Sequence, residues 1–205
     1  MPPDALSGPS QQRGRFLIAY PGRGWRRIWM RAPLLYWRLG LKPLITHARF
    51  FRFLVLTTRG RKSGRPRHTM LAHFVLDDRI YIGAGWGQRT QWYQNTLADP
   101  RVTVETRGPA FGALACTVTD EELRAIYWHA RGMGPLWMWK RSLESWDIRD
   151  DVEDFVAKRD RIPFLRLDPT GENPLPPLRA DLVWVWPMLA IAAAAVYVLL
   201  RTTRV

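Results

Sequence analysis

The chain has 205 residues, of which 47% are hydrophobic, enough for one domain with a core and short extensions. Residues 1–78 contain 15 Lys and Arg against 3 Asp and Glu, so this part carries +12 of the net +13 and favours an anionic partner such as nucleic acid, anionic lipid or an acidic cofactor. The single cysteine, Cys116, excludes an intrachain disulfide and suits a reducing compartment, and the four histidines show no metal-ligand spacing.

The first fifty residues divide into two segments. Residues 1–15 are polar and rich in Pro and Gly, with no secretory signal, and are expected to form a flexible tail. Residues 16–50 are basic and aromatic, which predicts an amphipathic helical segment on an anionic bilayer, broken by Pro33. The alternative is a helix that packs across the domain with its arginines in water.

A β domain is expected over residues 51–167. Short apolar, β-branched runs predict six strands at 53–58, 68–76, 79–84, 101–107, 111–118 and 162–167. Asp77-Asp78 predicts a tight hairpin turn. Short helices are expected at residues 90–100 and 119–131, the second with a capping box of Thr119 and Glu122. This pattern is mainly β with helices, an α+β fold built on a small barrel.

The connection "RGRKSGRPR" places Lys62 and Ser63 between Gly60 and Gly64. It is not a P-loop, because the residue before Lys62 is Arg61 and Pro66 keeps Arg65 away from helical angles. Two interpretations remain: a turn whose backbone N–H groups and cations bind an anion, or an exposed basic turn.

The C-terminal part reads as a linker followed by an apolar segment. Residues 168–181 are rich in Pro and Gly. Residues 182–200 are uncharged, and a helix of that length spans about 28 Å, which predicts a transmembrane anchor with Trp184, Trp186 and Tyr197 near its ends. The alternative is a buried core helix. We expect a single-pass protein of the cell membrane, with the barrel facing the cytoplasm and the C-terminus outside.

Three stretches carry a resemblance: "LTTRGRKSGRPR", "DDRIYIGAGWG" and "WYQNTLADPRVTVE". In this order and spacing they resemble the deazaflavin-dependent nitroreductase and quinone reductase family of actinobacteria. The resemblance covers about residues 50–127 and a last strand near residue 165. It implies a split β-barrel of the flavin- and deazaflavin-binding type that uses reduced coenzyme F420.

The resemblance also implies the residues of a cofactor site. The cations and hydroxyl that would hold the phosphate and the acidic tail are Arg61, Lys62, Ser63 and Arg67. The strand that would run past the cofactor contains His68, Thr69, Met70, Leu71 and Ala72. Lying against the ring, or on the short helix beside it, would be Gly83, Ala84, Gly85, Trp86, Trp92, Tyr93 and Asn95. Trp92 and Tyr93 have simple core packing as an equal alternative. The protonating group stays open among His68, His73, Tyr81 and solvent.

We therefore expect an F420-dependent oxidoreductase that transfers a hydride to a lipophilic acceptor, such as a quinone or a nitro compound, at the membrane surface. One alternative keeps the barrel but uses flavin mononucleotide (FMN). Another is a membrane-bound deazaflavin carrier or lipid-binding module without catalysis. The expected partners are the acceptor and anionic membrane lipid, with a homodimer as an option and no nucleic acid.

Overall fold

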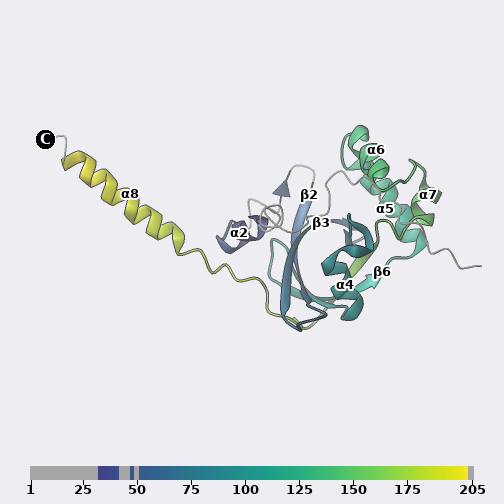
Figure 1. Cartoon of the computed structure of the whole chain (residues 1–205), viewed down its shortest axis with the longest axis horizontal. Coiled ribbons are helices and arrows are strands. Elements are labelled where there is room, and N and C mark those ends of the chain that lie inside the picture. Colours follow the sequence, from purple (N-terminus) through teal and green to yellow (C-terminus); the bar gives the residue numbers. More distant parts are fainter. Residues whose placement is uncertain (1–31, 42–46, 49–50, 203–205) are drawn as a thin grey trace, which may run out of the picture.

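The computed structural model describes residues 32–41, 47–48 and 51–202, and its centre is an antiparallel β-barrel (Figure 1). The strands are β1 (His47–Ala48), β2 (Phe51–Arg59), β3 (Pro66–Leu76), β4 (Arg79–Gly83), β5 (Arg101–Glu105), β6 (Phe111–Thr117) and β7 (Phe164–Thr170). Their order is β1-β2-β3-β4-β7-β6-β5, and a further pairing of β2 with β5 closes a barrel of the six longer strands. The six expected strands and the α+β barrel are confirmed.

Alternating residues of these strands fill the barrel. On β2, Leu54 and Leu56 are fully buried in this core, and Ile82 of β4 and Leu167 of β7 join them. The period of two in the sequence thus places one apolar face inward on each strand. The short helix α4 (Gln91–Ala98) packs against the same core.

The turn between β3 and β4 is made by Asp77 and Asp78, with φ angles of 47° and 60°. Positive φ at both central residues is what a two-residue hairpin turn with the right-handed twist requires, and Asp tolerates it better than most residues. The predicted hairpin is confirmed.

Three helices inserted between β6 and β7 cover part of the barrel's outer face: α5 (Asp120–Gly132), α6 (Leu136–Ser145) and α7 (Val152–Ala157). The predicted capping box is confirmed, since Thr119 accepts from the Glu122 amide and Glu122 accepts from the Thr119 amide. Tyr81 of β4 and Phe155 of α7 belong to the second core that these helices enclose.

The N-terminal segment is described as a helix only at α2 (Ala32–Arg38), which packs against the barrel. Trp37 is buried, and its indole Nε1 donates to Glu105 Oε2 at 3.2 Å. Helix α2 thus packs against the barrel, while Leu35 and Tyr36 are exposed, and the choice between the two interpretations of residues 16–50 stays a prediction. Pro33 lies in its first turn, and the predicted helical piece before it lies outside the described residues.

The segment after β7 runs back along the barrel to α2. Thr103 Oγ1 and the backbone of Leu175 hydrogen-bond each other, and the amide of Leu178 donates to Glu105 Oε1 at 2.6 Å. Arg38 then forms a bidentate pair with Asp181, with both N–O distances at 2.7 Å. The predicted linker is thus fixed at several points to the barrel and to α2.

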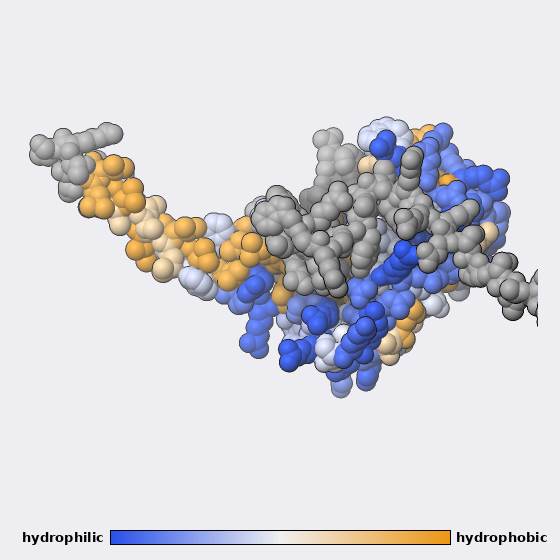
Figure 2. All heavy atoms as spheres, in the orientation of Figure 1, coloured by the Kyte–Doolittle hydropathy of each residue, from blue (hydrophilic) through white to orange (hydrophobic). Residues whose placement is uncertain are grey.

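The last helix, α8 (Val185–Thr202), extends away from the barrel and is apolar over its surface (Figures 1 and 2). Within the part of the chain that the structure describes, no helix combines the length and apolarity needed to cross a membrane. The transmembrane anchor predicted at residues 182–200 is therefore not supported.

The charge-free part of α8 is shorter than the predicted span. Helix α8 begins at Val185 and not at Leu182, with Pro187 in its first turn, where proline fits a helix. The first charged residue of this 18-residue helix is Arg201, so 16 residues, 185–200, precede it. Sixteen residues span about 24 Å, short of the roughly 30 Å of a hydrocarbon layer.

Candidate anion-binding site

The connection between β2 and β3 is a compact turn closed by its own backbone. The Gly60 amide donates to the Arg65 carbonyl at 2.9 Å, and the Gly64 amide donates to the Gly60 carbonyl at 2.7 Å. Gly64 has a φ of 66°, a conformation that favours glycine. The Ser63 amide also donates to Gly60, so the amides of Ser63 and Gly64 are used inside the turn. The cationic character of the turn therefore comes from its side chains.

Asn95 of α4 holds this turn from the side. Its buried side-chain Oδ1 accepts from the Arg61 amide at 3.3 Å and from Arg61 Nη1 at 3.1 Å. Its Nδ2 donates to Thr58 Oγ1 at 3.2 Å, and Gln91 adds an acceptor for Arg61 Nη1 at 3.2 Å. Two residues that the sequence assigned to one site, Arg61 and Asn95, are thus in direct contact.

This connection, residues 60–67, is called the basic turn below. It carries positive charge that no carboxylate of the described residues neutralises. Among the residues that the structure describes, Arg61, Lys62, Arg65 and Arg67 form no ion pair with a carboxylate, although all four are exposed. Arg67 Nη2 donates a hydrogen bond to Ser63 Oγ at 3.4 Å. A ligand with several negative charges complements such a cluster.

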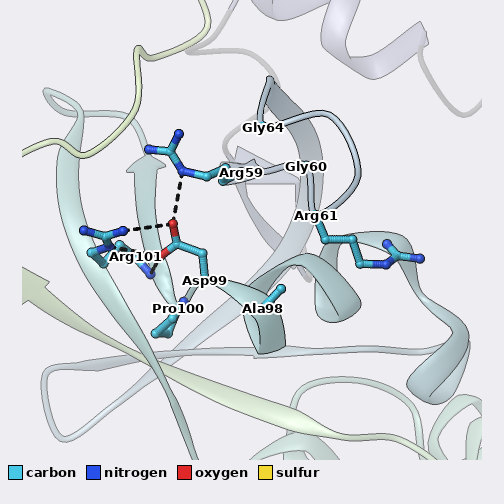
Figure 3. Close-up of a pocket in the computed structure, with 8 residues that line it drawn as sticks. All are labelled: Arg59, Gly60, Arg61, Gly64, Ala98, Asp99, Pro100 and Arg101. Atoms are coloured by element: carbon cyan, nitrogen blue, oxygen red, sulfur yellow. Dashed lines mark hydrogen bonds and ion pairs between the residues drawn. The ribbon is translucent and has the colours of Figure 1, made fainter.

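A pocket of about 480 Å³ lies beside the turn (Figure 3). Its charged walls are Arg59, Arg61, Asp99 and Arg101, and its other lining residues are Gly60, Gly64, Ala98 and Pro100. Asp99 lies between two of the arginines, with 3.1 Å to Arg59 Nε and 3.0 Å to Arg101 Nε. The guanidinium of Arg101, together with that of Arg59, holds the pKa of Asp99 below its ordinary value.

Sequence reasoning did not single out Arg59, Asp99 or Arg101. Arg59 directly precedes the glycine turn, and Asp99 and Arg101 flank the proline that follows α4. The sequence alone could not identify these three residues as neighbours, because it does not show that the end of β2 and the end of α4 meet in space.

The strand after Arg67 alternates between two environments. Leu71 packs against the barrel core, whereas His68 is on the other face, where its Nδ1 lies 2.9 Å from Thr57 Oγ1. Burial lowers the pKa of His68 below its ordinary value. The partly exposed Thr69 and Met70 and the exposed Ala72 complete the predicted stretch.

The small residues after β4 have packing reasons of their own. A Cβ on Gly83 would lie 2.7 Å from Phe164 Cε1, and Ala84 is fully buried in the barrel core. The Gly85 carbonyl accepts from Trp146 Nε1 at 2.9 Å. Trp86 is partly exposed at the start of the short 3-10 helix η1 (Gly87–Arg89), which leads into α4. Contact of these residues with a cofactor stays a prediction.

On α4, Trp92 and Tyr93 are buried with their rings edge to face, 6.0 Å apart, in the barrel core. Both side chains are therefore packed in the core, as the alternative expected. Of the three predicted residues on this helix, Asn95 contacts the basic turn.

The three candidate proton donors lie in different places. His68 adjoins the basic turn through Arg67. His73 is buried at a β3 position paired with Arg52 and Ile82, and burial, followed by the charge of Arg52, lowers its pKa to about 4. Tyr81 donates to Glu122 Oε1 at 2.9 Å beneath α5, and burial, then Glu122, raises its pKa. Of the three, His68 alone is next to the turn.

Comparison with known proteins adds a family. Residues 43–137, slightly less than half of the chain, match the model of the F420H(2)-dependent quinone reductase family. This match spans the basic turn and α4, and it confirms the resemblance expected from the three motifs. The description of the family names F420H(2) and does not mention FMN.

Several solved structures are also similar. An F420-H2 dependent reductase (FDR-A) is 24% identical, with 57% of this chain and 93% of that chain covered and a TM-score of 0.37. Conserved hypothetical protein Rv2991 from Mycobacterium tuberculosis is 19% identical (62% and 76% covered, TM-score 0.36). General Stress Protein 26 from Bacillus anthracis is 16% identical (65% and 89% covered, TM-score 0.39). With TM-scores below 0.5, these likenesses carry no weight for fold or function.

Proposed function

We propose that this chain, whose residues 43–137 match the model of the F420H(2)-dependent quinone reductase family, transfers a hydride from reduced coenzyme F420 to a lipophilic acceptor such as a quinone or a nitro compound. The observation that carries the proposal is the basic turn. Four cations without a carboxylate partner in the described structure lie on a turn that the buried Asn95 holds in place.

The residues of the turn suit the group that the family name implies. Coenzyme F420 combines a phosphate with an acidic tail, and Arg61, Lys62, Ser63 and Arg67 offer cationic and hydroxyl donors within one turn. When bound, the reduced deazaflavin supplies the hydride. The side chains of the turn would bind and orient its anionic part. His68 and Thr57, a hydrogen-bonded pair on neighbouring strands, would line the path away from the turn.

The lipophilic class of acceptor is supported by the family description and by α8. Large apolar side chains of α8 are exposed, among them Ile191 (68% exposed) and Leu199 (63%). A helix that exposes such side chains favours a lipid surface, where quinones also dissolve. A membrane-surface location, contact with anionic lipid and a homodimer are predictions that go with this function.

Cofactor titration followed by rapid kinetics tests the proposal. The purified chain is titrated in detergent with coenzyme F420 and with FMN, and the reduced cofactor is then mixed with menaquinone analogues and nitroaromatics in a stopped-flow instrument. We expect tight binding of F420 and reoxidation that depends on acceptor concentration. Tighter binding of FMN would contradict the cofactor assignment. Tight F420 binding with no reoxidation by any acceptor would favour the carrier alternative.

A further inference from the structure

Asp99 already occupies a carboxylate-binding position formed by two arginines. Arg101 contacts both of its oxygens, with 3.0 Å from Nε to Oδ1 and 3.2 Å from Nη2 to Oδ2, and Arg59 Nε contacts Oδ2 at 3.1 Å. This is the bidentate geometry in which arginine binds carboxylates and phosphates. Two arginines of the pocket wall therefore bind a carboxylate that belongs to the protein itself.

The two arginines keep capacity for a further anion. Figure 3 shows the terminal nitrogens of Arg59 on the side of its guanidinium away from Asp99, and in the described structure Arg59 uses Nε alone toward that residue. The side chains of Arg59 and Arg101 are 45% and 67% exposed, so a dissolved anion can reach them. Two cations share one carboxylate here, which leaves this wall of the pocket positive.

Asp99 also has a local role that does not need its charge. Its amide donates to the Asn95 carbonyl at the end of α4, and its Oδ1 accepts from the Arg101 amide at 3.2 Å. An asparagine retains the Oδ1 acceptor and with it this turn, as such short polar side chains do in turns. The negative charge of Asp99 therefore interacts with the two guanidinium groups, and the local turn after α4 does not require it.

We propose that Arg59 and Arg101 form a second oxyanion subsite beside the basic turn, and that Asp99 is a built-in competitor that lowers its affinity. The ligand class is a carboxylate-rich extension of the molecule that the turn binds. Under the proposed function, on which this identity rests, the extension is the acidic tail of the cofactor. An incoming carboxylate exchanges with Asp99 for the same donors, so binding stays reversible and depends on how many carboxylates the ligand offers.

The test compares three ligands on matched variants. The ligands are coenzyme F420 with its glutamate tail, the tail-less form that keeps the phosphate, and a γ-linked triglutamate peptide alone. The variants are Asp99→Asn, Arg59→Gln and Arg101→Gln. Asp181→Asn is the matched control, because it removes a surface carboxylate from another arginine pair, that of Arg38.

We expect Asp99→Asn to tighten binding of the tailed cofactor and of the peptide by roughly three- to tenfold, the size of one exposed charge interaction. Arg59→Gln and Arg101→Gln should weaken binding of both by a similar factor. The tail-less form should change by less than about twofold, and Asp181→Asn should leave all three ligands as in the unmodified chain.

Unchanged affinity of Asp99→Asn for both the tailed cofactor and the peptide would overturn the inference while leaving the proposed function intact. Equal gains for the tailed and tail-less forms would also overturn it, because the effect would then come from the phosphate. If the unmodified chain binds neither form of the cofactor, the proposed function fails, and the peptide titration decides on the subsite by itself.

Discussion

Arg61 and Asn95 are 34 positions apart in the sequence, yet the Asn95 side chain accepts two hydrogen bonds from Arg61, one from its backbone and one from its guanidinium. Asn95 is buried and also donates to Thr58 at the end of β2. The side-chain amide of Asn95 thus links α4, the end of β2 and the first cation of the basic turn. The position of that cation depends on a residue that does not need to contact any ligand.

Two substitutions of Asn95 distinguish its contribution to stability from the effect of its lack of charge on cofactor binding. Asn95→Ala removes three hydrogen bonds at a buried position and should lower the free energy of unfolding by about 1–3 kcal/mol. Asn95→Asp keeps the acceptor for Arg61 and should lose less stability, but its carboxylate neutralises Arg61 and should weaken cofactor binding about tenfold. Urea denaturation and cofactor titration measure the two effects. Cofactor binding by Asn95→Asp as tight as that of the unmodified chain would refute this role.

Lys62 provides the most direct test of the basic turn. Lys62→Ala should weaken binding of coenzyme F420 about tenfold, the loss of one charge-assisted contact. Binding to the unmodified chain should weaken between 50 and 500 mM salt, values chosen to span roughly 14 to 4 Å of Debye length. Lys140→Ala is the matched control, since Lys140 is also an exposed lysine and lies on α6. Equal effects of the two substitutions would mean that only net charge matters.

His73 should make the protein sensitive to acid. Its pKa is about 4 in the folded chain, below the ordinary value of 6.5, so the unfolded chain takes up a proton first as pH falls. The free energy of unfolding should therefore decrease from pH 6.5 toward pH 4, by at most about 3 kcal/mol and by less where solvent screens Arg52.

The measurement is urea denaturation at several pH values for the unmodified chain and for His73→Gln. The substituted chain should show a smaller decrease over this range, and the remainder is expected from His68 and His129, whose pKa values burial also lowers. Identical pH profiles for the two chains would contradict the assignment to His73.

Gly83 distinguishes packing from ligand approach. Gly83→Ala brings a methyl group against Phe164 and should destabilise the protein by about 1–3 kcal/mol. Phe164→Leu in the same chain should restore part of that loss, a coupling that thermal denaturation of the four chains of a double-mutant cycle measures. If the double variant is stable but no longer binds the cofactor, Gly83 is needed for two reasons: to make room for Phe164 and to let the ligand approach.

The strands and capping signals could be predicted because they depend on residues close together in the chain. The alternation of apolar residues on β2, the Asp77-Asp78 turn and the Thr119 cap are of this kind. Helix α6 was not predicted, because the Gly and Pro residues before Leu136 conceal the spacing of Trp139 and Leu143, which are buried on one face.

The site could be predicted only in part, for the opposite reason. The basic turn is continuous in sequence and was identified, as was the α4 motif with Asn95. The ion-pair cluster of Arg59 and Asp99 joins positions 40 residues apart, which no local pattern reveals. For α8, the run of uncharged residues was visible, but the start of the helix at Val185 was not.

Strand β7 lies between β4 and β6 and pairs with both, although the three helices of the insertion separate it from β6 in the sequence. On the ribosome, β4 and β6 are therefore made long before the strand that joins them, and each presents an unpaired edge until residues 164–170 emerge. An exposed edge recruits strands from other chains. The helices α5 to α7 are synthesised during this interval and can cover the apolar outer face of β4 around Tyr81 first. A nascent chain stalled before β7 should thus be the species most in need of a chaperone.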